Sequence, residues 1–264
     1  MKIPCRGRAL SDPPLVMGIL NLTPDSFSDG GRWTDPKIAV QHAFDMIDQG
    51  ADIIDIGAES TRPGSEPVPE EEEWSRLSSV LKEVIDSVDV PISVDTLKPG
   101  VARKAIDAGT HIINDVNGLR MEGMIEVCAD SDVCVAISHM HGEYGSMHRT
   151  YMEGAYKDQI RAFLDSQCAR CVDAGISDDR IIVDPGIGFG KTPEQNMGIV
   201  EDCGFLGSGH PILIGVSRKR FVREFYPDCD VDKASAVLSK KAIDSGASIV
   251  RVHNVEVTVR ELGI

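Results

Sequence analysis

The chain of 264 residues repeats one unit eight times: a short apolar run of strand length, a polar residue that closes it, and in most units a helical stretch. Apolar runs without polar alternation are typical of strands buried on both faces of a parallel sheet. No linker or low-complexity stretch divides the series. The apolar runs span residues 15–21, 51–57, 91–95, 112–116, 133–139, 181–184, 211–217 and 248–253.

Eight strand–helix units predict a single (β/α)8 barrel over residues 15–264, because such barrels use a chain of this length as one domain. A doubly wound open sheet is the structural alternative. Residues 1–14 lack periodicity and are expected to form a lead-in segment. Long polar loops follow the first two strands, and the helix after strand six looks short. Helices are expected over residues 35–49, from Pro69 onward, 99–108, 121–130, 153–174 and 230–245.

Composition limits the partners of this chain. A net charge of −15 argues against nucleic acid or an anionic membrane as the main partner. No run reaches the roughly 18 apolar residues of a membrane span, and the N-terminus lacks the apolar core of a signal peptide. We therefore expect a soluble, cytoplasmic protein. An anionic substrate would need a local cluster of basic residues.

Seven cysteines are scattered without a framework spacing, which predicts reduced thiols. Cys168 and Cys171 form the one CxxC pair. It lies in a long helical stretch without flanking glycines, so ordinary helix positions are favoured over a redox or zinc site.

Polar side chains stand at the end of nearly every predicted strand, where a (β/α)8 barrel carries its active site. One subset suits hydrogen bonding to a neutral heterocycle and consists of Asp95, Asn114 and Asp184. A second subset is cationic and suits phosphate in an otherwise acidic chain. It consists of Arg62, Lys219, Arg251 and His253.

Asp184 ends the run Ile181–Val183 and is followed at once by Pro185 and Gly186. A carboxylate in that place suits the two parallel N–H donors of a cyclic amidine or guanidine edge. The alternative is an aspartate that caps the next turn.

Two further motifs give only weak evidence for a function: a possible phosphate loop and a possible zinc site. The segment 186–192 looks like a phosphate loop, but Pro185 occupies its first glycine position, and the segment does not open a nucleotide-binding βαβ unit. His139 and His141 have the spacing of some metal ligands but lack identifiable carboxylate partners, so zinc is disfavoured.

Six motifs resemble those of the dihydropteroate synthase family. They cover about residues 15–254 and follow the order and spacing of the family. The first two loop motifs and Ser-Arg-Lys are specific in combination, whereas a barrel alone would not be. The motifs are Asn21–Gly30, Glu59–Gly64, Ile113–Val116, Asp184–Lys191 (with Phe189 as its aromatic residue), Ser217–Lys219 and Arg251–His253.

The resemblance implies condensation of 6-hydroxymethyl-dihydropterin diphosphate with an arylamine, usually p-aminobenzoate, in folate biosynthesis. It also implies a homodimer. Asn21 would bind Mg²⁺ on the diphosphate, and Thr61 with the mobile first two loops would close over the arylamine. The implied pterin-binding residues are Asp95, Asn114, Asp184 and Lys219, with Phe189 and Ser217 also on the substrate. The implied phosphate-binding residues are Arg62, Arg251 and His253. The implied catalytic set is Asp95, Asp184, Lys219, Arg251 and His253.

Three positions depart from the family pattern: Ser138 stands where methionine is usual, Arg220 where serine is common, and Asn254 where aspartate is common. Arg220 adds a charge and a bidentate fork near the expected place of the acceptor's carboxylate. It either points outward to an acidic neighbour, with p-aminobenzoate as acceptor, or faces a more anionic acceptor such as a phosphorylated arylamine.

Two further functions are weighed against the synthase. A pterin-dependent methyltransferase would share the barrel but has no use for a diphosphate site. A non-catalytic pterin-binding protein would not need Asn21 or either loop motif.

Overall fold

A computed structural model describes residues 2–22, 35–60, 67–144, 150–207 and 209–264. Eight parallel strands form one sheet in the order β8-β7-β6-β5-β4-β3-β10-β9. A parallel bridge between Val183 and Ile212 joins the two ends of that order, so the sheet closes into a barrel. The predicted (β/α)8 barrel is confirmed. Its strands are β3 (Leu15–Asn21), β4 (Ile53–Gly57), β5 (Ile92–Asp95), β6 (Ile112–Asp115), β7 (Cys134–Ser138), β8 (Ile181–Asp184), β9 (Leu213–Ile214) and β10 (Ile249–Val252).

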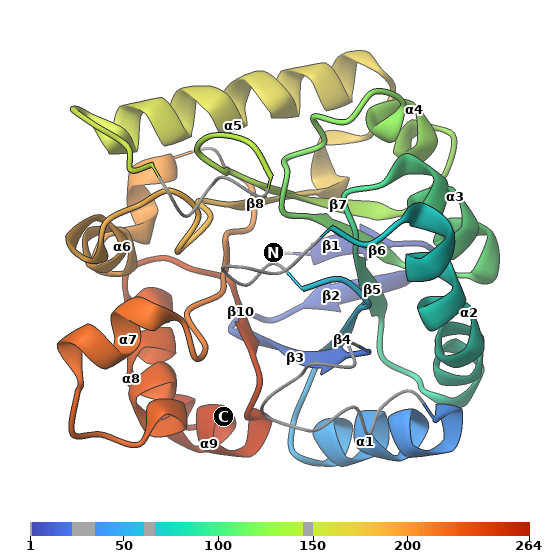
Figure 1. Ribbon diagram of the computed structural model, residues 1–264, viewed down its shortest axis with the longest axis horizontal. Helices are drawn as coiled ribbons and strands as arrows, with labels where there is room; N and C mark the ends of the chain where they lie inside the picture. Colours follow the sequence, from blue (N-terminus) through green and yellow to red (C-terminus); the bar gives the residue numbers. More distant parts are fainter. Residues whose placement is uncertain (1, 23–34, 61–66, 145–149, 208) are drawn as a thin grey trace.

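Helices surround the ring of strands (Figure 1). Proline at the first helical position begins α1, α3 and α6, and glycine in the left-handed conformation ends α3 and α9. The helices are α1 (Pro36–Asp48), α2 (Glu70–Ser87), α3 (Pro99–Ala108), α4 (Met124–Ala129), α5 (Tyr156–Asp173), α6 (Pro193–Val200), α7 (Arg220–Phe225), α8 (Val231–Asp244) and α9 (Val255–Leu262). No helix in the described ranges is long and apolar enough to cross a membrane.

The lead-in contains an element that the sequence did not predict. Strands β1 (Lys2–Cys5) and β2 (Arg8–Ser11) pair as an antiparallel hairpin, which turns at Arg6 and Gly7 with positive φ. The hairpin packs its buried side chains against the apolar lower layer of the barrel interior. That cluster consists of Ile3, Cys5, Leu10, Leu15, Met17, Ile53, Ile112, Cys134, Ala136, Ile182, Leu213 and Ile249.

The cysteines fit the predicted reduced thiols: all seven are free, and six are buried. Cys168 and Cys171 lie in α5 and face the core, so their assignment to ordinary helix positions is confirmed.

The barrel interior is therefore filled by apolar side chains at the end that the hairpin covers and by polar side chains at the opposite end. Side chains alternate along each strand, so Ile53, Asp55 and Gly57 share the inner face of β4. The carboxyl ends of all eight parallel strands point to the same rim. The polar end of the barrel is where a site would form.

Candidate active site

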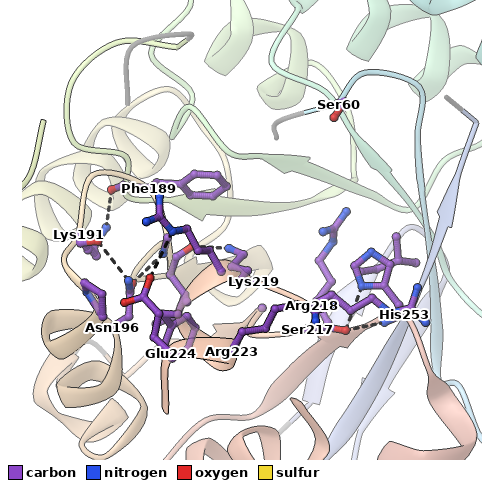
Figure 2. A pocket seen from close by; sticks show the side chains of 18 of the residues that line it. Ser60, Phe189, Lys191, Asn196, Ser217, Arg218, Lys219, Arg223, Glu224 and His253 are labelled. Carbon is purple, nitrogen blue, oxygen red and sulfur yellow. Dashed lines mark hydrogen bonds and ion pairs between the residues drawn. The ribbon is translucent and has the colours of Figure 1, made fainter. Parts of the chain in front are cut away.

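A cavity of about 690 Å³ opens at the carboxyl ends of the strands (Figure 2). Eight of the residues predicted from sequence line it: Asn21, Asp95, Phe189, Ser217, Lys219, Arg220, Arg251 and His253. Asn114 and Asp184 do not line it and are buried beside it, with 3% and 8% of their surface exposed. Thr61 and Arg62 lie outside the described residues, as does most of both predicted loops.

Arg251, which belongs to the predicted cationic subset, forms hydrogen bonds with two aspartates, and one of them belongs to the other predicted subset. From β10 its Nε donates to Asp55 Oδ2 at 2.6 Å, and its Nη2 donates to Asp95 Oδ2 at 2.7 Å. Burial raises the pKa of Asp95 to about 7; Arg251 opposes that rise and Asp55 adds to it. Arg251 of the predicted phosphate set thus contacts Asp95 of the predicted heterocycle set, and its binding of a phosphate stays a prediction.

Asp55 is a site residue that sequence reasoning missed. It is fully buried, and its Oδ2 also receives Asn114 Nδ2 at 3.4 Å. Among the described residues, the other oxygens Asp55 Oδ1 and Asn114 Oδ1 have no hydrogen-bond partner, and neither has the buried hydroxyl of Ser93. Buried acceptors without donors cost free energy, so this part of the barrel suits a ligand that brings N–H groups.

Asp184 forms the turn cap that was weighed as the alternative for it, and its binding of a ligand edge stays a prediction. Its Oδ1 accepts from Gly186 N at 2.6 Å, which is the predicted turn cap, and its Oδ2 accepts from Ser138 Oγ at 3.3 Å. Burial raises the pKa of Asp184, opposed first by the charge of Lys219 and then by the Gly186 amide. Ser138, one of the departures, thus supplies a donor to this carboxylate that methionine could not.

The glycines after Asp184 are required by close contacts. Gly186 and Gly190 have φ of +71° and +67°. A Cβ on Gly186 would lie 1.8 Å from His139 O, and one on Gly190 would lie 2.6 Å from His141 Cβ. The loop can therefore pass this close to the end of β7 only without side chains at these positions.

Lys191 holds this loop from inside and was also missed as a site residue. Its Nζ donates to Gly186 O at 2.8 Å and to Phe189 O at 3.1 Å, and lies 3.0 Å from His139 Nδ1. Burial lowers the pKa of Lys191 to about 7 and that of His139 to about 2, so His139 is a neutral acceptor. The signal was Lys191 itself, which ends the family motif Asp184–Lys191.

Lys219 and Phe189 meet at the wall of the cavity (Figure 2). Lys219 Nζ donates to Ile187 O and lies 4.4 Å from the centroid of the Phe189 ring, within range of a cation–π contact. Burial lowers the pKa of Lys219 to about 8, opposed by the charge of Asp184. A cation and an aromatic face are thus presented together beside a buried carboxylate.

The remaining predicted residues form the rim. His253 Nδ1 lies 2.9 Å from Ser217 Oγ, and the His253 amide donates to the same oxygen at 3.1 Å. The Arg220 side chain is 87% exposed and lies 3.2 Å from Glu224 Oε1, one helical turn along α7. Asn21 is half-buried at the end of β3.

The site combines unsatisfied acceptors deep in the barrel with lysine, arginine and histidine at its rim. Such a cavity suits an enzyme that binds a small, nitrogen-rich, anionic substrate. A family model described as pterin binding enzyme matches residues 17–253. The chain belongs to this family.

Relatives in the family are similar over nearly the whole chain. A dihydropteroate synthase of Clostridium beijerinckii is 44% identical over 225 residues, which cover 84% of this chain and 81% of that protein. The dihydropteroate synthase of Escherichia coli K12 is 38% identical over 268 residues, covering 100% and 95%. The solved dihydropteroate synthase of Xanthomonas albilineans with 4-aminobenzoic acid has a TM-score of 0.91 at 39% identity, covering 99% of this chain and 96% of that one. That of Burkholderia cenocepacia, complexed with 7,8-dihydropteroate, has a TM-score of 0.89 at 36% identity, covering 99% and 94%.

Proposed function

We propose that this chain is a transferase that condenses 6-hydroxymethyl-7,8-dihydropterin diphosphate with p-aminobenzoate and releases diphosphate. One observation carries the proposal: two oxygens of Asp55 and Asn114, which have no hydrogen-bond partner within the described part of the chain, lie deep in the barrel, with Asp184 buried at the end of another strand. The amino-pyrimidine edge of a pterin brings several N–H donors to such acceptors. The relatives' names and their bound 4-aminobenzoic acid and dihydropteroate support the same substrates.

In this proposal the pterin lies between Asp184 and the Lys219–Phe189 pair. Asp184 accepts from the amino-pyrimidine edge, Asn114 and Asp95 complete the hydrogen bonds, and Lys219 donates to the ring. Buried and fixed polar groups of this kind position a ligand without reorganising, which is the larger part of their catalytic value.

The reaction breaks one bond and forms another. The arylamine nitrogen attacks the pterin methylene carbon, the C–O bond to the diphosphate breaks, and the diphosphate leaves with the bonding electrons. The product is first a protonated secondary amine, which then releases one proton to become the neutral amine. Positive charge gathers on the methylene carbon, which Asp95 and Asp184 stabilise, while Arg62, Arg251 and His253 bind the leaving diphosphate.

Mg²⁺ fits Asn21, because this ion takes oxygen ligands and commonly binds through one or two protein groups and substrate phosphates. Asn21 lines the cavity, and the described residues contain no group of three histidine, cysteine or acidic side chains that could hold a metal alone. An ion held jointly by Asn21 and the diphosphate would neutralise the charge of the leaving group.

The proposal extends to assembly and compartment. We propose a homodimer, which the family resemblance implies, with the 42% exposed Phe225 of α7 and the 40% exposed Val237 of α8 at its interface. Sedimentation equilibrium would test it, and a monomer at micromolar concentration would overturn it. The free, mostly buried cysteines fit a reducing compartment such as the cytoplasm.

The synthase assignment is tested by diphosphate release on mixing the chain with pterin diphosphate, Mg²⁺ and p-aminobenzoate. Release should require all three components. Release without an arylamine would indicate hydrolysis, and no release with every component present would overturn the proposal.

A further inference from the structure

Asp232 of α8 contacts two separate segments of the site. Arg218 donates Nε to its Oδ1 at 2.7 Å and Nη2 to its Oδ2 at 2.9 Å. The same Oδ2 accepts from Asn254 Nδ2 at 3.1 Å. The Asp232 side chain is 16% exposed, and the Arg218 hydrogen bonds are the main cause that lowers its pKa. Asp232 is therefore an ionised carboxylate shared between an arginine and an amide.

One partner of Asp232, Arg218, lines the cavity itself, and the other, Asn254, stands next to a residue that lines it. Arg218 lies between Ser217 and Lys219, and Asn254 directly follows His253. Figure 2 shows Ser217, Arg218 and His253 gathered at one side of the cavity, with Lys219 nearer to Phe189. One carboxylate outside the cavity is thus linked to both of its cationic walls.

The turn at Arg218 needs such support. Its φ of +57° is in the left-handed region, which a residue with a side chain adopts only where surrounding contacts hold it. The Arg218 amide donates to Ser235 Oγ of α8 at 3.0 Å, so α8 holds both the backbone and the side chain of this residue.

We propose that Asp232 is a positioning residue for the synthase site. Through Arg218 it fixes the turn that carries Lys219, and through Asn254 it fixes the end of β10 that carries His253. It contacts no substrate. The inference rests on the proposed function for the roles of Lys219 and His253, whereas the contacts of Asp232 are independent of that function.

Asn254 matches this arrangement better than the aspartate that is common at its position. Its Nδ2 donates to Asp232 while its Oδ1 accepts from Val257 N at 3.1 Å, as the N-cap of α9. Aspartate could cap the helix equally well. It has no N–H for Asp232, however, and would bring a second carboxylate against it.

The test exchanges the carboxylate of residue 232 and the amide of residue 254, first one at a time and then together. Asp232→Asn should lower kcat/KM for the pterin diphosphate roughly tenfold or more, because Lys219 loses its fixed place. Asn254→Asp should also lower it, because two carboxylates then face each other. The double variant restores one carboxylate opposite one amide and should recover part of the loss. A double variant no better than the worse single variant would overturn the proposal.

Asp230→Asn is the matched control. Asp230 caps α8 by accepting from Asp232 N and Lys233 N, and asparagine caps as well, so turnover should stay at the wild-type level. If Asp232 supported only the fold, Asp232→Asn would lower the melting temperature and leave kcat/KM of the folded enzyme unchanged. That result would overturn the positioning role.

Amide hydrogen exchange separates this inference from the proposed function, because it needs no substrate. Exchange in residues 216–221 and 252–255 should rise in Asp232→Asn and not in Asp230→Asn. An inactive wild type with this exchange pattern would refute the synthase and leave the structural link standing. Unchanged exchange in Asp232→Asn would refute the link itself.

Discussion

Arg251 and Asp55 form an ion pair across the mouth of the barrel, with Nε and Oδ2 only 2.6 Å apart. Asp55 is fully buried, while the Arg251 side chain is 21% exposed and reaches Asp95 with its second nitrogen. A buried carboxylate needs such a partner. The arginine proposed to bind the diphosphate is therefore also required by the barrel interior.

This double role decides which Arg251 variant is informative. Arg251→Ala leaves Asp55 as an unpaired buried charge and should lower the free energy of unfolding by about 3–5 kcal/mol in urea denaturation. Arg251→Lys keeps a cation near Asp55 but loses the bidentate fork. It should therefore keep most of the stability, reduce kcat/KM for the pterin diphosphate strongly, and leave calorimetric affinity for the bare pterin alcohol nearly intact. Equal losses for both ligands would mean that Arg251 does not bind the diphosphate.

The raised pKa of Asp95, about 7, gives a stability prediction with a definite sign. Between its usual pKa near 3.8 and about 7, the folded chain holds a proton on Asp95 that the unfolded chain has released. Stability therefore falls as pH rises through this window, at most about 1.4 kcal/mol per pH unit.

Asp95→Asn removes that contribution while keeping the shape of the side chain. Urea denaturation of the wild type and of Asp95→Asn between pH 4.5 and pH 7.5 separates the contribution of Asp95 from that of other groups, such as Asp115, that titrate in the same range. The stability of the variant relative to the wild type should rise with pH. A constant difference would mean that Asp95 ionises at its ordinary pKa.

Arg220 tests the choice of acceptor. Arg220 pairs with the acidic Glu224 at the rim of the cavity, and an acidic partner is what the interpretation with p-aminobenzoate as acceptor requires. Since a surface pair of this spacing contributes little, Arg220→Ser should change kcat/KM by about twofold or less for p-aminobenzoate. The same small change is expected for a phosphorylated arylamine and for the control Glu224→Gln. A selective loss for the phosphorylated arylamine in Arg220→Ser would instead assign Arg220 to acceptor binding.

Sequence reasoning located the strands because their buried runs are apolar throughout and end at glycine or a polar residue. It missed the hairpin of residues 2–11, since two four-residue strands are too short to show a period. It placed the seventh strand over residues 211–217, of which only Leu213–Ile214 is strand, because an apolar run marks burial and not hydrogen-bonded pairing.

The site was predicted where a polar residue closes a strand and missed where it does not. Asp55 stands two residues before the end of β4, so it looked like part of a strand and not like a site residue. That Arg251 pairs with Asp55 and Asp95 depends on which side chains face each other across the barrel, which spacing along the chain cannot reveal. Arg62 and Thr61, outside the described residues, remain predictions.

In the proposed function a pterin binds by its donor edge to Asp184. Asp184→Asn keeps the size of the side chain but replaces one acceptor oxygen with an NH2 donor. That NH2 group would face an N–H group of the ligand or of the protein, so one hydrogen bond is lost. Ser138→Ala is the matched control, because it removes a neighbour of the same carboxylate and changes none of its acceptors. Calorimetric titration with the bare pterin alcohol should show that Asp184→Asn loses roughly 2–4 kcal/mol of binding free energy, well beyond the loss in Ser138→Ala. An unchanged affinity for the pterin alcohol in Asp184→Asn would show that the pterin does not bind through this carboxylate.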